Sequence, residues 1–210
     1  MLKHFPKTGR SAASYHTCRY RFGAKSHARY VGVDDGSFEF QRCTCYAREK
    51  TVLAVVLLEG IRIVTVRIGR ITVDGLDATA TLNQLLRDLK FDAVFLSGVS
   101  FAGFNLIDAY EIYRTYGKPV IIVSGRRPDN HSVKKALSLH FKDWQTRWAI
   151  INKLGVVHQV RSCATEPPLF FEVVGTSTSK ARRLIKDSAR LGRLPEPVRV
   201  ADLVAKGLSA

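Results

Sequence analysis

Three aspartates lie where apolar runs end, in a chain that is otherwise rich in lysine and arginine. They are Asp34 in YVGVDDGSF, Asp77 in RITVDGLDAT and Asp202 in PEPVRVADLVA. Carboxylate oxygens are the ligands that hard cations such as Mg²⁺ and Mn²⁺ prefer in proteins. We therefore predict that the three aspartates are catalytic, and that they hold one of these cations opposite a phosphate backbone if the fold brings them together.

Each of these aspartates also has an ordinary structural explanation. Asp34 begins an Asp-Asp-Gly turn, and Asp77 stands where a side chain would cap the free N–H groups at the start of a helix. Asp202 precedes Lys206 by four residues, which is the spacing of an ion pair on a helix surface. Asp74 is a second candidate in the Asp77 loop. The residue pattern leaves the catalytic and the structural interpretations open.

Basic residues gather at two places that suit phosphate binding. Two arginines follow the apolar run 119–123, where the end of a strand would let them clamp phosphates. A strongly basic helix is expected further along the chain, although its charges would also suit a solvated helix face. The residues predicted to bind nucleic acid are Arg126, Arg127, Lys180, Arg182, Arg183, Lys186 and Arg190.

The overall charge favours a polyanionic partner. With 33 Lys and Arg against 18 Asp and Glu, the 210-residue chain carries a formal net charge of +15. Such a charge attracts DNA or RNA and resists self-association, so we expect a monomer. A basic proteome or a partner with an acidic surface would also explain it. The longest apolar run, Val52 to Leu58, falls far short of the ~20 residues of a membrane helix, and the N-terminus lacks a secretory signal. We expect a cytoplasmic protein.

The cysteines and glycine-rich loops exclude several other classes. Four scattered cysteines do not suggest a disulfide scaffold. A zinc site from His16, Cys18, Cys43 and Cys45 is an alternative, but its spacings match common zinc motifs poorly. The loop 97–105 carries two glycines and matches no P-loop, which argues against a nucleotide triphosphatase.

The first half of the chain predicts strands followed by a helix. Strands are expected at 28–33, 51–58 and 61–71, the last two joined by a tight turn at Glu59-Gly60. Along 61–71 both sets of alternate positions contain apolar residues, so neither face of the strand would be purely polar. This pattern suggests a central strand covered on both faces. A helix is expected at 78–89, since its leucines recur at helical spacing.

The second half predicts a parallel β-α-β unit and further helices. Strands at 93–96 and 119–123, joined by a helix at 105–116 that ends at Gly117, should be parallel. The remaining elements are helices at 131–139 and 142–153, strands at 156–161 and 169–174, and helices at 178–191 and 199–208. Together these predict an α/β fold with one mixed sheet, in which three antiparallel strands are followed by parallel strands and helices flank the sheet. The domain would cover 28–210, after a basic and flexible arm at 1–27.

Four segments together resemble an uncharacterised archaeal protein family related to endonuclease V. They are VGVDDGSF, ITVDGLDAT, SFAGFNLIDAYEIYRTYGKPVIIVSGRRPD and GRLPEPVRVADLVA, of which GFN and PEP-R-x-AD are the most specific parts. The resemblance covers about residues 28–208 and implies a ribonuclease H-like fold. It also implies a metal-dependent nuclease of DNA repair, which cleaves a phosphodiester bond near deaminated purines with carboxylates matching Asp34, Asp77 and Asp202.

The chain departs from the pattern of endonuclease V at three places. Ser97 matches a position that is usually an aspartate before glycine, so one charged metal ligand is lost. The lysine on the lesion side is replaced by Gly125, beside Arg126, and the tyrosine wedge is not evident. These departures argue against specificity for deaminated bases. They also support an alternative function, a catalytically inactive module that binds nucleic acid.

Overall fold

Runs rich in valine and isoleucine form the strands of the computed structural model, which describes residues 28–37 and 49–209. Within these residues the strands are β1 (Arg29–Asp35), β2 (Lys50–Glu59), β3 (Arg62–Thr72), β4 (Ala93–Leu96), β5 (Ser100–Phe101), β6 (Asn105–Leu106), β7 (Val120–Ser124), β8 (His158–Val160) and β9 (Leu169–Val174). The helices are α1 (Ala78–Leu86), α2 (Ala109–Tyr116), α3 (Asn130–His140), α4 (Trp144–Asn152), α5 (Thr178–Ser188) and α6 (Glu196–Leu208).

Seven strands form one mixed sheet in the order β3-β2-β1-β4-β7-β9-β8, and β5 pairs with β6 in a separate small hairpin. The strands β1, β2 and β3 are antiparallel to one another, while β1, β4 and β7 are parallel. This arrangement confirms the predicted mixed α/β sheet, including the parallel β4-α2-β7 unit. Because β1, β4 and β7 run the same way, the residues at or next to their carboxyl ends (Asp34, Ser97 and Ser124) lie along one edge of the sheet.

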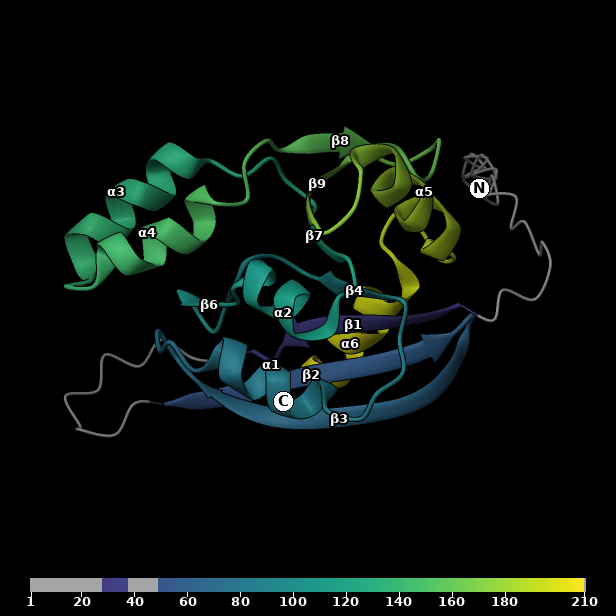
Figure 1. Cartoon of the computed structure of the whole chain (residues 1–210), viewed down its shortest axis with the longest axis horizontal. Coiled ribbons are helices and arrows are strands. Elements are labelled where there is room, and N and C mark those ends of the chain that lie inside the picture. The colour runs from purple at the N-terminus through teal and green to yellow at the C-terminus, as the bar shows by residue number, and fades with distance from the viewer. Residues whose placement is uncertain (1–27, 38–48, 210) are drawn as a thin grey trace, which may run out of the picture.

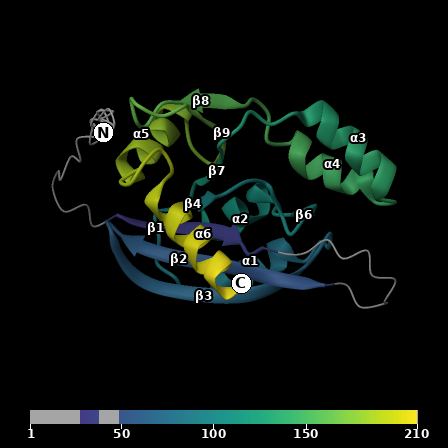
Figure 2. The ribbon, with the colours of Figure 1, turned by 180° about the vertical axis from the view of Figure 1, so that it is seen from behind.

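Helices cover both faces of the sheet. Buried residues of α1 and α2 pack with one side of β1, β2, β4 and β7, whereas buried residues of α5 and α6 pack on the other side. Figures 1 and 2 show these two layers from opposite directions, with α1 and α2 in front in the first view and α6 in front in the second. The α3–α4 pair lies at one end of the molecule (Figure 1).

A glycine decides how closely α6 approaches β1. A Cβ atom built on Gly32 would lie only 2.0 Å from the carbonyl carbon and oxygen of Pro197, at the start of α6. Only glycine leaves room for the helix to rest directly on the strand. This contact sets the path of α6 across the sheet, and Asp202 follows on the same helix.

Strand β3 differs from the prediction of a strand covered on both faces. It lies at the edge of the sheet, and Ile63, Val64, Val66 and Ile68 are exposed. One face of β3 meets α1, where Gly69 approaches Thr81 and Leu85. On the other face, α6 packs against β1 and β2. Apolar alternation therefore indicated a strand correctly but not its position in the sheet.

Several helices begin or end differently from the prediction. Helix α1 ends at Leu86 and not at residue 89, and α6 begins at Glu196 and not at residue 199. The predicted helix 105–116 begins only at Ala109, because Asp108 is its N-cap and accepts hydrogen bonds from the N–H groups of Tyr110 and Glu111. Its end at Gly117, with φ 62°, is confirmed. Helix α5 ends at Ser188 and not at Leu191, so Arg190 lies beyond it.

Some predictions fall on residues that the structure does not describe. The basic arm at 1–27 and the alternative zinc ligands His16, Cys18, Cys43 and Cys45 lie outside the described residues. Among residues 28–37 and 49–209, none of the helices has the length and apolar character needed to cross a membrane.

Candidate functional site

Asp34 lies at the edge where β1 and β4 end, and α6 carries Asp202 across β1 into its electrostatic surroundings. Asp34 Oδ1 accepts a short hydrogen bond from the hydroxyl of Ser97 at the end of β4, and a second from the N–H of Asp35 at 2.9 Å. The negative charge of Asp202 on α6 acts on Asp34, and Asp202 Oδ1 lies 2.7 Å from Lys206 Nζ. The fold thus joins a strand near the N-terminus, a central strand and the last helix.

The electrostatics of this group are those of carboxylates crowded in a partly buried space. Burial raises the pKa of Asp34 to about 7, and the charges of Asp35 and Asp202 add to the rise. The hydrogen bonds from Ser97 and from the Asp35 N–H oppose it. A positive charge placed beside Asp34 would relieve this unfavourable environment.

Asp35 lies in the same environment but faces the opposite side of the sheet. Successive side chains of a strand alternate, and Asp34 pairs with Ala54 whereas Asp35 pairs with Leu53. Asp35 Oδ2 accepts a hydrogen bond from the N–H of Ala102 at 2.6 Å. Burial raises the pKa of Asp35 as well. From the sequence, Asp35 is expected only as a turn residue. Its place next to Asp34 in the chain is the one sign that it lies near the candidate site.

Asp77 belongs to a separate network. Its carboxylate accepts hydrogen bonds from the N–H and the hydroxyl of Thr72, at 3.1 and 2.8 Å, and from Asn105 Nδ2 at 2.5 Å. It makes no side-chain cap to helix α1, contrary to the structural role expected for it; the buried Asn105 instead accepts the N–H of Ala78. None of the interactions recorded among the described residues joins Asp77 to Asp34 or Asp202.

A buried arginine fastens the Asp77 loop to the β5–β6 hairpin. Arg147 on α4 is 3% exposed, and its guanidinium donates to the carbonyl oxygens of Asp74, Gly75 and Phe104 at 2.6 to 3.0 Å. Asp74, the alternative candidate in the loop, accepts the N–H of Phe104. These bonds hold the loop that carries Asp74 and Asp77 against the hairpin.

We expect the substitution Asp77→Asn to lower the free energy of unfolding by about 1 to 3 kcal/mol at pH 7, because it weakens hydrogen bonds to a charged acceptor. Burial alone would raise the pKa of Asp77, but the hydrogen bonds from Asn105 and Thr72 outweigh it and hold the pKa below 3.8. The contribution of Asp77 is therefore present above about pH 4 and fades as the pH falls through the lower folded value. Urea denaturation of both proteins at pH 7 and pH 3 measures this, and equal stability at pH 7 would contradict it.

The oxygen donors around Asp34 suit one divalent cation better than a cluster of cations. In the described part of the chain, no three His, Cys, Asp or Glu side chains are placed to hold a metal ion together. Asp34 and Asp202 with the hydroxyl of Ser97 supply only oxygen donors, and the crowding that raises the pKa of Asp34 would be relieved by a cation. Mg²⁺ is commonly bound through one or two carboxylates, several waters and a phosphate of the substrate.

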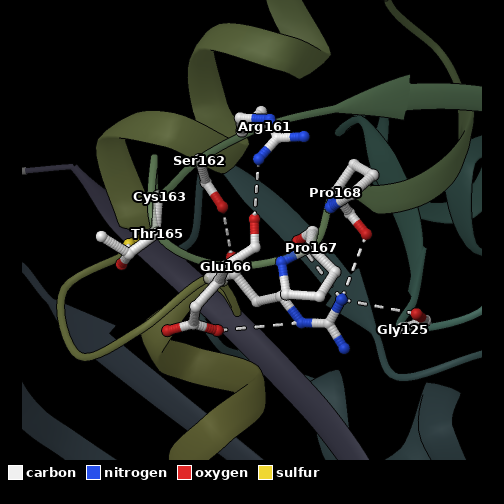
Figure 3. Close-up of polar contacts among 9 residues, drawn as sticks. Gly125, Arg161, Ser162, Cys163, Thr165, Glu166, Pro167 and Pro168 are labelled. Carbon is white, nitrogen blue, oxygen red and sulfur yellow. Dashed lines mark hydrogen bonds and ion pairs between the residues drawn. The ribbon is translucent and has the colours of Figure 1, made fainter.

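The loop after β7 presents two of the predicted phosphate-binding arginines. Arg126 and Arg127 are exposed at the same sheet edge as Asp34. Arg193 holds the loop in place: its Nη1 donates to the carbonyl oxygens of Gly125, Pro167 and Pro168 at 3.4, 3.3 and 3.1 Å (Figure 3). The sequence did not single out Arg193, whose partners are distant along the chain.

The basic helix α5 lies closer to the other end of β1. Ala181 and Ile185 are buried against the sheet, and Lys180, Arg182, Arg183 and Lys186 are exposed as predicted. Tyr30, near the start of β1, is under the influence of the charges of Asp187 and Arg190. Four residues of strand, roughly 13 Å, separate Tyr30 from Asp34. The structure therefore does not gather all predicted basic residues around Asp34.

Comparisons with known proteins agree with this fold. The family model described as Endonuclease dU matches residues 26–209. A UPF0215 protein of Thermococcus gammatolerans is 33% identical over 190 residues, covering 88% of this chain and 93% of that protein. A crystal structure of a protein of unknown function from Archaeoglobus fulgidus has a TM-score of 0.75 and 30% identity, covering 86% and 98% of the two chains.

Endonuclease V shares the architecture at lower identity. The endonuclease V of Ciona intestinalis, solved with a DNA containing an inosine followed by a ribo-adenosine, has a TM-score of 0.52 and 15% identity, covering 85% of this chain and 84% of that one. This likeness shows the ribonuclease H-like fold that the sequence predicted.

Proposed function

The chain belongs to the Endonuclease dU family, and from this premise we propose that it is a nucleic-acid-binding endonuclease that hydrolyses phosphodiester bonds with Mg²⁺ or Mn²⁺. The observation that carries the proposal is the packing of α6 on β1, which brings Asp202 close enough to act electrostatically on Asp34 in a chain with a net charge of +15. Carboxylates in such a basic protein suit a site where a cation and a phosphate group are bound together.

The residues of the chain divide the work by position. Asp34 and Asp202 would hold the cation, and Arg126 and Arg127 would bind phosphates next to the cleaved bond. The chemistry supplied by a bound cation is neutralisation of charge on the phosphate and activation of a water molecule. Asp77 would act as a positioning residue, because its hydrogen bonds hold the loop between β3 and α1.

The hydrogen bond from Ser97 to Asp34 supports a second candidate function. The neutral hydroxyl of Ser97 occupies the position where endonuclease V is expected to have a carboxylate, and it donates a hydrogen bond to Asp34. The protein would then bind nucleic acid without cleaving it. Binding that depends on salt and is unaffected by chelators, together with an absence of cleavage, distinguishes this module from an endonuclease.

The choice of substrate is the test of the proposal. The family description names dU, so labelled single-stranded and double-stranded DNA and RNA with one deoxyuridine, one inosine or no modified base form the substrate set. The purified protein is incubated with each in Mg²⁺, Mn²⁺ or EDTA. Cleavage that requires the cation supports an endonuclease, whereas tight binding with no cleavage under any condition supports the binding module.

The charges of α5 should contribute to affinity rather than to the chemical step. We expect the triple variant Lys180→Glu, Arg183→Glu and Lys186→Glu to weaken DNA binding about tenfold at low salt. The slope of the logarithm of the binding constant against the logarithm of the salt concentration should become less steep by roughly 2 to 3. The substrate concentration for half-maximal rate should rise, with little change in the maximal rate, because the helix lies near the start of β1.

A matched variant controls for net charge. Lys90, Arg114 and Lys118 are exposed outside α5, in the loop before β4, on α2 and in the loop before β7, and their replacement by glutamate changes the net charge equally. Fluorescence anisotropy over a salt series compares the two triple variants, and equal losses would mean that α5 makes no specific contact.

The proposal also includes a monomer in the cytoplasm, in which the arm at 1–27 adds phosphate contacts to the domain at 28–210.

A further inference from the structure

Lys206 places a positive charge at the carboxylates of the candidate site. It follows Asp202 by one turn of α6, and its Nζ lies 2.7 Å from Asp202 Oδ1. The same ammonium is also influenced by Asp34 on β1. Lys206 therefore belongs to the electrostatic environment of both carboxylates, and its role is wider than that of an isolated ion pair on a helix.

The packing of α6 explains why the ammonium faces this group. Ala201 and Ala205 are buried against the sheet, so the neighbouring positions of the helix lie at the rim of that contact. The close approach at Gly32 and Pro197 fixes the helix on β1. The side chains of Asp202 and Lys206 are 32% and 60% exposed, which leaves both within reach of a solvent ion or a phosphate.

The balance of charge limits how many cations this group can hold. Asp34, Asp35 and Asp202 provide at most three negative charges, Ser97 provides none, and Lys206 already supplies one positive charge. Asp35 faces the opposite side of the sheet and accepts the N–H of Ala102. Two divalent cations 3.5 to 4 Å apart, as in two-metal nuclease sites, would face strong uncompensated repulsion here.

We propose that the ammonium of Lys206 takes the place of a second metal ion, so that Asp34 and Asp202 bind a single divalent cation. Lys206 then also limits how tightly the site binds that single cation, because its ammonium lies beside Asp202. The inference rests on the proposed function only in its premise that these two carboxylates bind a cation. It does not require that the protein cleaves nucleic acid.

Titration of the full-length protein with MnCl₂ tests this directly. The free protein is titrated at pH 8 by isothermal calorimetry, with free Mn²⁺ followed by electron paramagnetic resonance. We expect one Mn²⁺ per chain at Asp34, and a dissociation constant about three to ten times lower in Lys206→Met, because a repelling charge is removed. Lys206→Gln gives a second neutral variant should the first fold poorly.

Two controls separate the local effect from the loss of one positive charge. Lys206→Arg keeps the charge and should bind Mn²⁺ as the parent does. Lys118→Met removes one charge at the opposite end of the parallel strands and should also leave the affinity unchanged. Two Mn²⁺ ions bound at Asp34 in the parent, or unchanged or weaker binding in both neutral variants, would overturn the proposal.

The variant Asp34→Asn distinguishes failure of this inference from failure of the proposed function. If Asp34→Asn abolishes Mn²⁺ binding while the neutral Lys206 variants bind as the parent does, only the role of Lys206 is wrong. If Asp34→Asn binds Mn²⁺ as well as the parent, the cation site itself is wrong, and both proposals fail together.

Discussion

Asp34→Asn should reduce cleavage by about a thousandfold or more, which corresponds to about 4 kcal/mol of transition-state stabilisation. The side chain keeps its size and can still accept the hydrogen bond of Ser97, but it no longer offers a negative oxygen to a cation. The loss is measured as the single-turnover rate with saturating protein and Mn²⁺. A variant that cuts as fast as the parent would remove Asp34 from the mechanism.

The same substitution should stabilise the protein when divalent cations are absent. Asp34 keeps its proton to about pH 7 in the folded protein, whereas an exposed carboxyl releases it near 3.8. The folded state thus binds more protons between these values, and the contribution of Asp34 to stability falls as the pH rises through them. We expect Asp34→Asn to gain roughly 2 to 4 kcal/mol at pH 8 and almost nothing at pH 4.

The control for this stability effect is an aspartate outside the site. Asp88 is exposed, with φ 64°, a backbone conformation that asparagine tolerates well. Asp88→Asn should leave both cleavage and the pH dependence of stability close to those of the parent. Thermal unfolding in EDTA from pH 4 to pH 8 makes the comparison. Identical curves for Asp34→Asn and the parent would mean that Asp34 is not held in an unfavourable environment.

Ser97→Asp should increase Mn²⁺ affinity by about 10- to 100-fold, because a third carboxylate joins Asp34 and Asp202 around the same position. The gain has a cost in the free protein. A further negative charge beside Asp34 should lower the melting temperature in EDTA, and saturating Mn²⁺ should restore it, since a ligand stabilises the state that binds it. Calorimetry and thermal unfolding in EDTA and in Mn²⁺ measure the two effects.

The neutral variant Ser97→Asn provides the matched control, since it has nearly the size of aspartate without its charge. It should show neither the higher affinity nor the recovery by Mn²⁺. Unchanged affinity in Ser97→Asp would place the residue outside the cation site. The activity of Ser97→Asp also separates the two candidate functions, because cleavage that appears only in this variant indicates a nuclease that lost one ligand.

Local sequence patterns determined most of the elements of this protein. Alternating and continuous apolar runs predicted β1, β2, β3, β4, β7 and β9. A strand with one buried face has alternating apolar residues, and a strand with two buried faces has a continuous apolar run. Gly60 and Gly117 adopt positive φ angles at the predicted hairpin turn and helix end. The family resemblance then supplied the fold, which the comparisons show, and pointed to Asp34, Asp77, Ser97 and Asp202.

The helix starts show where local patterns were insufficient. Asn105 and Asp108 both had the chemistry of a cap, and the predicted helix began at the wrong one. In the structure, Asp108 caps α2 while Asn105 is fully buried and binds Thr72, Asp77 and Ala78. The choice depended on a segment about thirty residues earlier, which no local window contains.

The sequence by itself determined the charge, the secondary-structure types and the residues with suitable chemistry. Only the tertiary structure decided which of them act together, because contacts between distant strands and helices depend on packing. Ser97 reaches Asp34 across 63 positions, and Asp202 reaches it because Gly32 lets α6 rest on β1. Asp77 has an equally suggestive sequence environment, and in the structure its carboxylate, in the loop between β3 and α1, accepts hydrogen bonds from Thr72 and Asn105.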